Sequence, residues 1–184
     1  FPTVRCVFGD RDADRTIALV GNSHAGQWVP AFERLGKQRG WRVVSYLASR
    51  CASADVDQEF DTSADTEACR DWVRRVSERV ATESPDLVVM TNRISVPAIG
   101  SSGSSESLYQ AGFAAVLGSW RDHGLPVLVL RDTPAPGDAG LHSIPDCLAS
   151  NPDDVDACSG SRSDWIPADP AVDAARALGD QQVM

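Results

Sequence analysis

Thr16-Ile17-Ala18-Leu19-Val20-Gly21-Asn22-Ser23-His24-Ala25 joins a short, mostly apolar run to a turn and then to a helical pattern. The apolar run is bounded by turn residues and predicts a buried strand over 16–20. The spacing of apolar residues beyond the turn predicts a helix over 25–39. Ser23 therefore stands between a strand and a helix. There it either caps the helix, with Gly21 making the turn, or is held as a nucleophile at the positive end of the helix dipole.

The same alternation of strand and helix continues along the chain. Further strands are predicted at 41–47, 87–90 and 126–130, and further helices at 66–83, 106–122 and 170–178. This order predicts a doubly wound, flavodoxin-like α/β fold, with a parallel sheet of four to five strands flanked by helices. Residues 52–65 and 132–169 lack periodicity and are expected to be irregular. A fifth strand is expected where the chain ends, so we predict a single domain over 1–184 that is cut before its last strand.

Four residues with reactive or polar groups follow predicted strands. They are Ser23, Cys51, Asn92 and Asp132. The carboxyl ends of parallel strands lie along one edge of a sheet, and ligands of such folds bind there. All four residues are expected at this edge, which favours a functional interpretation of Ser23 over simple helix capping.

Charge and composition exclude several classes of protein. The chain has 17 basic and 26 acidic residues and a net charge of −9, without a basic stripe. Nucleic acids and anionic membrane surfaces are therefore poor partners. No apolar run has the length of a transmembrane helix. The chain opens on Phe1 without a signal-peptide pattern, so we expect an excised domain or a mature form.

The chain has five cysteines, and none of them forms a Cys-x-x-Cys pair, so a zinc site is not indicated. Cys51 and Cys69 bracket one polar loop, and Cys147 and Cys158 bracket another. Disulfides that close these loops are favoured and indicate an oxidising compartment. Other pairings, and five reduced thiols, stay open. Cys6 is left over as a free thiol or as the partner of a cysteine outside this chain.

Residues 17–31, Ile17-Ala-Leu-Val-Gly-Asn-Ser-His-Ala-Gly-Gln-Trp-Val-Pro-Ala31, resemble the first block of the SGNH/GDSL hydrolase superfamily. More narrowly, they are similar to the extracytoplasmic SGNH domain fused to bacterial membrane proteins of the acyltransferase-3 family. That block reads Gly-Asp-Ser-His-Ala, followed by Gln-Trp-x-Pro-Ala. Weaker similarities, at 49–51, 85–89, 131–134 and 146–147 with Cys158, extend the resemblance over most of the chain.

The resemblance implies serine chemistry at the carboxyl edge of the sheet. Ser23 would attack an acyl carbonyl carbon and carry the acyl group as an acyl-enzyme. Asn92 and a backbone N–H at Cys51 would form the oxyanion hole that stabilises the negative oxygen. A simple turn role for Asn92 after its strand stays open.

The sequence departs from the family pattern at two places. Asn22 stands where the family usually has aspartate, and we expect a tolerated change because asparagine has a similar hydrogen-bonding reach. Together with Gly21 and His24 it is expected to support the turn. The family's general base lies in an Asp-x-x-His block after the last strand, and no such block occurs in the 184 residues. Either it lies beyond Met184 or the domain has lost it.

Three histidines are present, and one of them could replace that base. His24 is expected to pack beside the serine, and His123 to cap the end of a helix. His142, with Asp138 or Asp146 behind it, is the remaining candidate for a general base. No metal and no cofactor are expected.

The resemblance implies a cell-envelope enzyme outside the cytoplasm, tethered to the membrane by an upstream acyltransferase domain of the same protein. Its reaction would transfer an acetyl or other short acyl group from an acyl donor to a carbohydrate or glycolipid hydroxyl. A secreted carbohydrate esterase of the same superfamily is one alternative. A binding domain that has lost catalysis is another, favoured by the missing Asp-x-x-His block.

Overall fold

The computed structural model describes residues 4–140, 143–179 and 182–183. Its contacts divide the chain into two compact units. The first unit comprises Phe1–Arg131 and Pro170–Met184, and the second comprises Asp132–Asp169. Among the described residues, no helix combines the length and the apolar character needed to cross a membrane.

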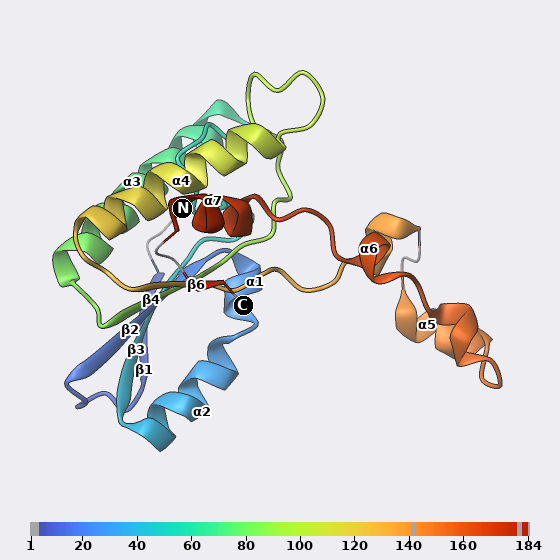
Figure 1. Cartoon of the computed structure of the whole chain (residues 1–184), viewed down its shortest axis with the longest axis horizontal. Coiled ribbons are helices and arrows are strands. Elements are labelled where there is room, and N and C mark those ends of the chain that lie inside the picture. Colours follow the sequence, from blue (N-terminus) through green and yellow to red (C-terminus); the bar gives the residue numbers. More distant parts are fainter. Residues whose placement is uncertain (1–3, 141–142, 180–181, 184) are drawn as a thin grey trace. The chain divides into compact units, whose positions relative to one another are not determined.

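The first unit is built on a six-stranded sheet with the order β1-β3-β2-β4-β5-β6 (Figure 1). The strands are β1 (Val4–Gly9), β2 (Arg15–Gly21), β3 (Trp41–Leu47), β4 (Leu87–Thr91), β5 (Val127–Val129) and β6 (Gln182–Val183). Neighbours from β3 to β6 are parallel. This part has the flavodoxin-like strand order, which confirms the predicted fold class.

The sheet has one strand more than the predicted four to five, because β1 pairs antiparallel with β3 at the edge. The sequence of β1, Val4-Arg5-Cys6-Val7-Phe8-Gly9, neither alternates nor forms a continuous apolar run. An edge strand needs neither pattern as strictly as a central strand does. The fifth parallel strand expected at the end of the chain is β6, whose two residues pair with β5.

Helices cover both faces of the sheet. They are α1 (Ser23–Gly26), α2 (Val29–Arg39), α3 (Ser63–Glu83), α4 (Glu106–Asp122) and α7 (Pro170–Leu178). Figure 1 shows α3, α4 and α7 on one side of the sheet and α2 on the other. The sheet is therefore doubly wound, as predicted.

The packing of β2 explains why its sequence is apolar without interruption. Ala18 and Val20 belong to a larger core that includes residues of α3, α4 and α7. Ile17 and Leu19 belong to a smaller core with Phe32 of α2. A strand covered on both faces needs apolar residues at every position, so no alternation appears.

The helix predicted over 25–39 is interrupted, and this part of the prediction is wrong. α1 ends at Gly26 and α2 begins at Val29. Pro30 lies in the first turn of α2. Proline has no backbone N–H, and its ring clashes with the carbonyl four residues earlier, so a continuous helix through this position is disfavoured.

The start of α3 also differs from the prediction. The helix begins at Ser63 rather than at Thr66. Thr62 caps it, because the threonine hydroxyl accepts a hydrogen bond from the Asp65 N–H at 3.1 Å. The cap falls inside the segment that was expected to be irregular.

The second unit contains short helical turns where no regular structure was expected. They are the 3₁₀ turns Pro136–Ala139 and Val155–Cys158, and the helices α5 (Ile144–Ser150) and α6 (Arg162–Trp165). A disulfide joins Cys147 to Cys158, with the Cα atoms 5.8 Å apart. This bond was one of the two favoured pairings.

Candidate active site

The turn after β2 lies directly against the end of β4. Gly21 is in register with Thr91, and its φ of 154° lies in a region that side chains disfavour. A Cβ atom at Gly21 would collide with the Thr91 carbonyl oxygen. Glycine therefore allows the β2 turn to sit beside β4, where the strand order of the sheet reverses. This switch point is where ligands of doubly wound folds bind.

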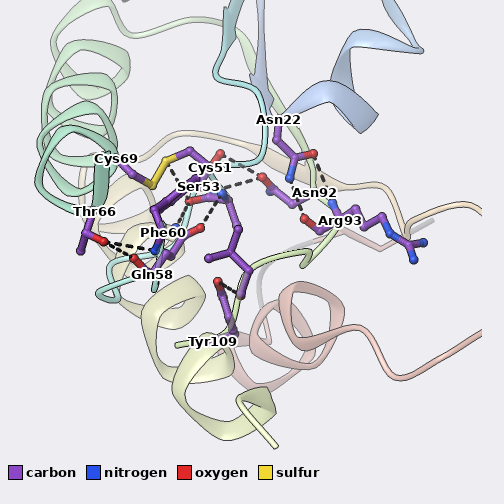
Figure 2. Close-up of a disulfide and its surroundings, with 12 residues drawn as sticks. Asn22, Cys51, Ser53, Gln58, Phe60, Thr66, Cys69, Asn92, Arg93 and Tyr109 are labelled. Carbon is purple, nitrogen blue, oxygen red and sulfur yellow. Dashed lines mark hydrogen bonds between the residues drawn. A yellow bond between two sulfur atoms is a disulfide. The ribbon is translucent and has the colours of Figure 1, made fainter. Parts of the chain in front are cut away.

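Asn22 ties this turn to the segment that follows β4. Its side chain is 1% exposed. Nδ2 donates a hydrogen bond to the Arg93 carbonyl oxygen at 2.6 Å, and Oδ1 accepts from the Arg93 N–H at 3.3 Å (Figure 2). Oδ1 also accepts from the His24 N–H at 3.1 Å. An aspartate could accept the same bonds but could not donate to the Arg93 carbonyl, so the asparagine suits this pair of turns.

Ser23 is the first residue of α1, and it is exposed. The helix cap is Asn22, whose Oδ1 accepts the bond from His24, so the alternative that Ser23 itself caps the helix is wrong. α1 has four residues, and so short a helix has little macrodipole at its N-terminus. The expected help from a helix dipole is therefore small.

Asn92 follows β4 and is 5% exposed. Its Oδ1 accepts two hydrogen bonds from Ser53, from the backbone N–H at 3.0 Å and from Oγ at 3.2 Å (Figure 2). Its Nδ2 is buried and has no hydrogen-bond partner within the described part of the chain. A buried donor without a partner destabilises a protein by about 1–3 kcal/mol. If Asn92 served only to form a turn, there would be no reason for its Nδ2 to be buried without a partner.

Cys51 lies after β3 and is fully buried. It forms a disulfide with Cys69 of α3, with the Cα atoms 5.7 Å apart, which is the second favoured pairing. The preceding residue, Arg50, has a φ of 65° and so adopts the left-handed backbone that glycine favours. The chain therefore turns sharply after β3. A donor role for the Cys51 N–H stays a prediction.

Cys6, in β1, is an exposed free thiol.

The histidines and acids considered as a general base fall in different places. His24 is half-buried beside the turn. His123 caps α4, with Nδ1 2.8 Å from the Ser119 carbonyl oxygen, as predicted. His142 lies outside the described residues, as does the side chain of Asp138.

Two acids that the sequence analysis considered lie in the second unit. The Asp146 N–H donates to Ser143 Oγ at 3.2 Å, so Asp146 belongs to the capped first turn of α5. The Asp132 N–H donates to Asp169 Oδ2 at 3.0 Å, and its own Oδ1 accepts from the Thr133 N–H. Both are thus engaged in local hydrogen bonds of that unit. Among the described residues there is also no group of three metal-ligating side chains.

Two residues of the site were missed by the sequence analysis. They are Ser53, which bonds to Asn92, and Arg93, whose peptide group pairs with Asn22. Ser53 lies two residues after the disulfide-bonded Cys51 in a segment without periodicity, and Arg93 directly follows Asn92. Neither has a sequence signal of its own, since the role of each comes from contacts between segments that are distant in the chain.

Comparison with known proteins gives a family and a fold. A family model described as "SGNH domain (fused to AT3 domains)" matches residues 2–181. The periplasmic domain of a lipopolysaccharide acetyltransferase of Salmonella ser. Paratyphi A has a similar structure, with a TM-score of 0.61. The sequences are 7% identical, and the match covers 96% of this chain and 68% of that one. At this identity the likeness shows a shared fold alone. None of the curated proteins matches the sequence.

Proposed function

Since the chain belongs to the family of SGNH domains that are fused to AT3 domains, we propose that it transfers an acyl group through an acyl-enzyme on Ser23. The acyl group is acetyl or similarly short, and the acceptor is a hydroxyl group of a cell-envelope carbohydrate or glycolipid. One observation carries the proposal. An exposed serine and a buried, unpartnered amide donor follow neighbouring strands, β2 and β4, at the switch point of the sheet.

The proposed chemistry has two steps. Ser23 Oγ attacks the acyl carbonyl carbon, loses its proton to a general base, and expels the donor's leaving group. The oxygen that becomes negative accepts a hydrogen bond from Asn92 Nδ2 and from backbone N–H groups, with Cys51 as the candidate among them. The carbohydrate hydroxyl then attacks the acyl-enzyme, which releases Ser23. The base is not assigned, because Asp-x-x-His does not occur in the sequence and His142 lies outside the described residues.

Two observations support a location outside the cytoplasm, and a third supports a membrane-bound partner domain. The two disulfides, Cys51–Cys69 and Cys147–Cys158, are typical of proteins in an oxidising compartment. The family's fusion to AT3 domains supports a membrane acyltransferase domain as partner in the same protein. The similar structure is described as a periplasmic domain. We propose that this domain likewise acts outside the cytoplasm, tethered to the membrane by that partner.

A fluorophosphonate probe tests the assignment of Ser23. Intact-mass measurement should detect one adduct on the protein in its natural sequence context, and Ser23→Ala should remove it. Ser63→Ala is the matched control, because Ser63 is also an exposed serine at the start of a helix. An adduct that persists in Ser23→Ala would exclude Ser23 as the activated nucleophile.

Two alternatives differ from the proposal in measurable products. A carbohydrate esterase would release the acyl group to water, so free acetate would form even when a sugar acceptor is in excess. A binding domain without catalysis is favoured by the absence of Asp-x-x-His from the sequence. Such a domain would take up no probe at Ser23, although it would be folded and would bind carbohydrate.

A further inference from the structure

The Asn92 amide has a fixed orientation, and the residue that fixes it is Ser53. Two donors of Ser53, the backbone N–H and the hydroxyl, meet the same acceptor, Asn92 Oδ1. The two side chains are 3% and 5% exposed, so water does not compete for these bonds. An amide rotated by half a turn would place its N–H₂ group against the Ser53 backbone N–H, which can only donate, although the hydroxyl could turn to accept. The observed orientation is therefore the one that leaves Nδ2 as the unpartnered end.

We propose that Ser53 is a positioning residue, which keeps Asn92 Nδ2 available for the acyl oxygen. This inference rests on the proposed function, in which Nδ2 is an oxyanion donor. An oxyanion donor is effective when it is held in place before the reaction, because no reorganisation is then needed. Ser53 provides this order without touching the substrate.

The segment that carries Ser53 is itself held from both sides. On one side, the buried Gln58 side chain exchanges two hydrogen bonds with Ala52, at 3.0 and 2.8 Å (Figure 2). On the other side, the Asp55 N–H donates to the Gly112 carbonyl oxygen of α4 at 3.1 Å. A Cβ atom at Gly112 would lie only 2.9–3.1 Å from the Asp55 backbone, so the glycine allows this close approach. Ser53 is therefore placed by the fold rather than by its bond to Asn92.

The Cys51–Cys69 disulfide adds a covalent tie to α3 at the start of this segment. Thr66, also in α3, holds its other end: Thr66 Oγ1 donates to the Gln58 carbonyl oxygen at 2.8 Å and accepts from the Phe60 N–H at 3.2 Å. These contacts order the segment without reaching Asn92. Thr66 therefore offers a control that loosens the same segment but leaves the Ser53–Asn92 bonds in place.

The test compares Ser53→Ala with Thr66→Val in the protein in its natural sequence context, with p-nitrophenyl acetate as the acyl donor. Each variant loses one buried hydroxyl: Ser53→Ala loses one within the segment, and Thr66→Val loses one of α3 that binds the end of the segment. Ser53→Ala should lower kcat about fivefold with KM unchanged, the equivalent of one neutral hydrogen bond. Thr66→Val should leave kcat within about twofold of the parent, because it does not touch Asn92. An equal loss of kcat in both variants would overturn the proposal.

A double-mutant cycle separates positioning from general loosening. In an Asn92→Ala background, Ser53→Ala should have no further effect on kcat, since no amide remains to be oriented. If Ser53→Ala lowers kcat by the same factor with and without Asn92→Ala, Ser53 does not act through Asn92.

A readout that does not depend on activity keeps this inference distinct from the proposed function. The side-chain N–H₂ resonances of Asn92 should shift or broaden in Ser53→Ala and stay unchanged in Thr66→Val. If Ser23→Ala retains full turnover, the proposed function fails, and the resonances still report whether Ser53 orients the amide. Unchanged Asn92 resonances in Ser53→Ala would overturn the inference even where Ser23 proves essential.

Discussion

Glu83 and Asn92 are polar residues of the first unit that differ in how many of their hydrogen-bonding atoms have partners. The Glu83 carboxylate, at the end of α3, accepts from Tyr46 Oη at 2.5 Å, Arg79 Nε at 2.7 Å and Arg5 Nη2 at 3.3 Å. Asn92 has its oxygen engaged twice by Ser53, whereas its Nδ2 finds no partner in the part of the chain that the structure describes. The Glu83 carboxylate thus accepts three hydrogen bonds, whereas Asn92 has one donor group without a partner.

The proposed function implies that this difference separates groups that stabilise the fold from groups held for a ligand. When every hydrogen-bonding atom of a buried polar group has a partner, those bonds offset the free-energy cost of removing the group from water. A buried donor without a partner offsets that cost only when a ligand accepts its hydrogen bond.

Trp72 Nε1 and Thr91 Oγ1 are also buried without a partner in the described chain. Trp72 belongs to α3, whereas Thr91 and Asn92 both lie at the switch point beside the Ser23 turn. Asn92 differs from Thr91 because its oxygen is held by Ser53, which leaves Nδ2 as a fixed donor, whereas a threonine hydroxyl can rotate and can either donate or accept. We therefore expect substitutions of Asn92 to change activity first, and substitutions of Glu83 to change stability.

The largest expected effect is that of Asn92→Ala on catalysis. Loss of one oxyanion-hole donor lowers kcat about a hundredfold or more. The same change leaves the two donors of Ser53 without an acceptor, which should also lower the free energy of unfolding by about 1–2 kcal/mol. Ester turnover and urea unfolding measure the two effects separately. Glu83→Gln is the comparison variant, and a hundredfold loss of kcat there too would break the distinction between the two groups.

The fold was largely predictable from the sequence, because burial on both faces leaves a strong local pattern. Ile17–Val20 reads as a continuous apolar run for that reason, and the helices that cover the sheet have regular spacing. β1 was missed because an edge strand is covered by fewer neighbours and carries little pattern. The break between α1 and α2, at residues 27–28 just before Pro30, was missed because the apolar spacing continues across it although the helix does not.

The site was predictable where a motif names its residues or where a residue directly follows a predicted strand, as Asn92 does. Ser23, Asn22 and Gly21 lie in one stretch, and the structure places them in one turn. The bonds from Ser53 to Asn92 and from Asn22 to Arg93 join segments that are 39 and 71 residues apart. Tertiary contacts of this kind leave no trace in local spacing, so no pattern in the sequence could have indicated them.

A smaller effect is expected for Glu83→Gln, this time on stability. Glutamine keeps one acceptor oxygen but loses the charge that strengthens the bonds from Tyr46 and Arg79. We expect the free energy of unfolding to fall by about 1 kcal/mol, with kcat unchanged. Glu78→Gln is the matched control in the same helix, since its exposed carboxylate pairs with Arg74 at 3.7 Å and lacks short hydrogen bonds within the described residues. If Glu78→Gln lowers the free energy of unfolding as much as Glu83→Gln does, the hydrogen bonds of Glu83 do not stabilise the protein more than an exposed ion pair does.

The contribution of Glu83 should depend on pH. Burial alone would raise the pKa of the Glu83 carboxyl, but hydrogen bonds from Tyr46, Arg79 and Arg5 outweigh it and hold the pKa below its ordinary value. A carboxyl with a lowered folded-state pKa stabilises the protein above its unfolded-state pKa, and this is lost as pH falls through the folded-state pKa. The stability difference between the parent and Glu83→Gln should therefore be constant from pH 7 to about 5 and shrink below about 4.5. A difference that is constant down to pH 3 would assign the effect to packing instead of charge.

The smallest expected effect is that of Arg5→Ala. Its contact with Glu83 is the longest of the three, at 3.3 Å, and its side chain is 36% exposed, so solvent screens the pair. We expect a loss of about 0.5 kcal/mol or less in urea unfolding, and a still smaller loss when Glu83→Gln is already present, because the two residues share one interaction. A loss larger than that of Glu83→Gln would mean that Arg5 stabilises the edge strand β1 through its packing and its 3.5 Å hydrogen bond to Tyr46 Oη rather than through the carboxylate. Tyr46 and Arg79 would then be the two residues whose hydrogen bonds hold the Glu83 carboxylate. Those two bonds would be what distinguishes Glu83 from Asn92, whose Nδ2 lacks a partner in the described chain.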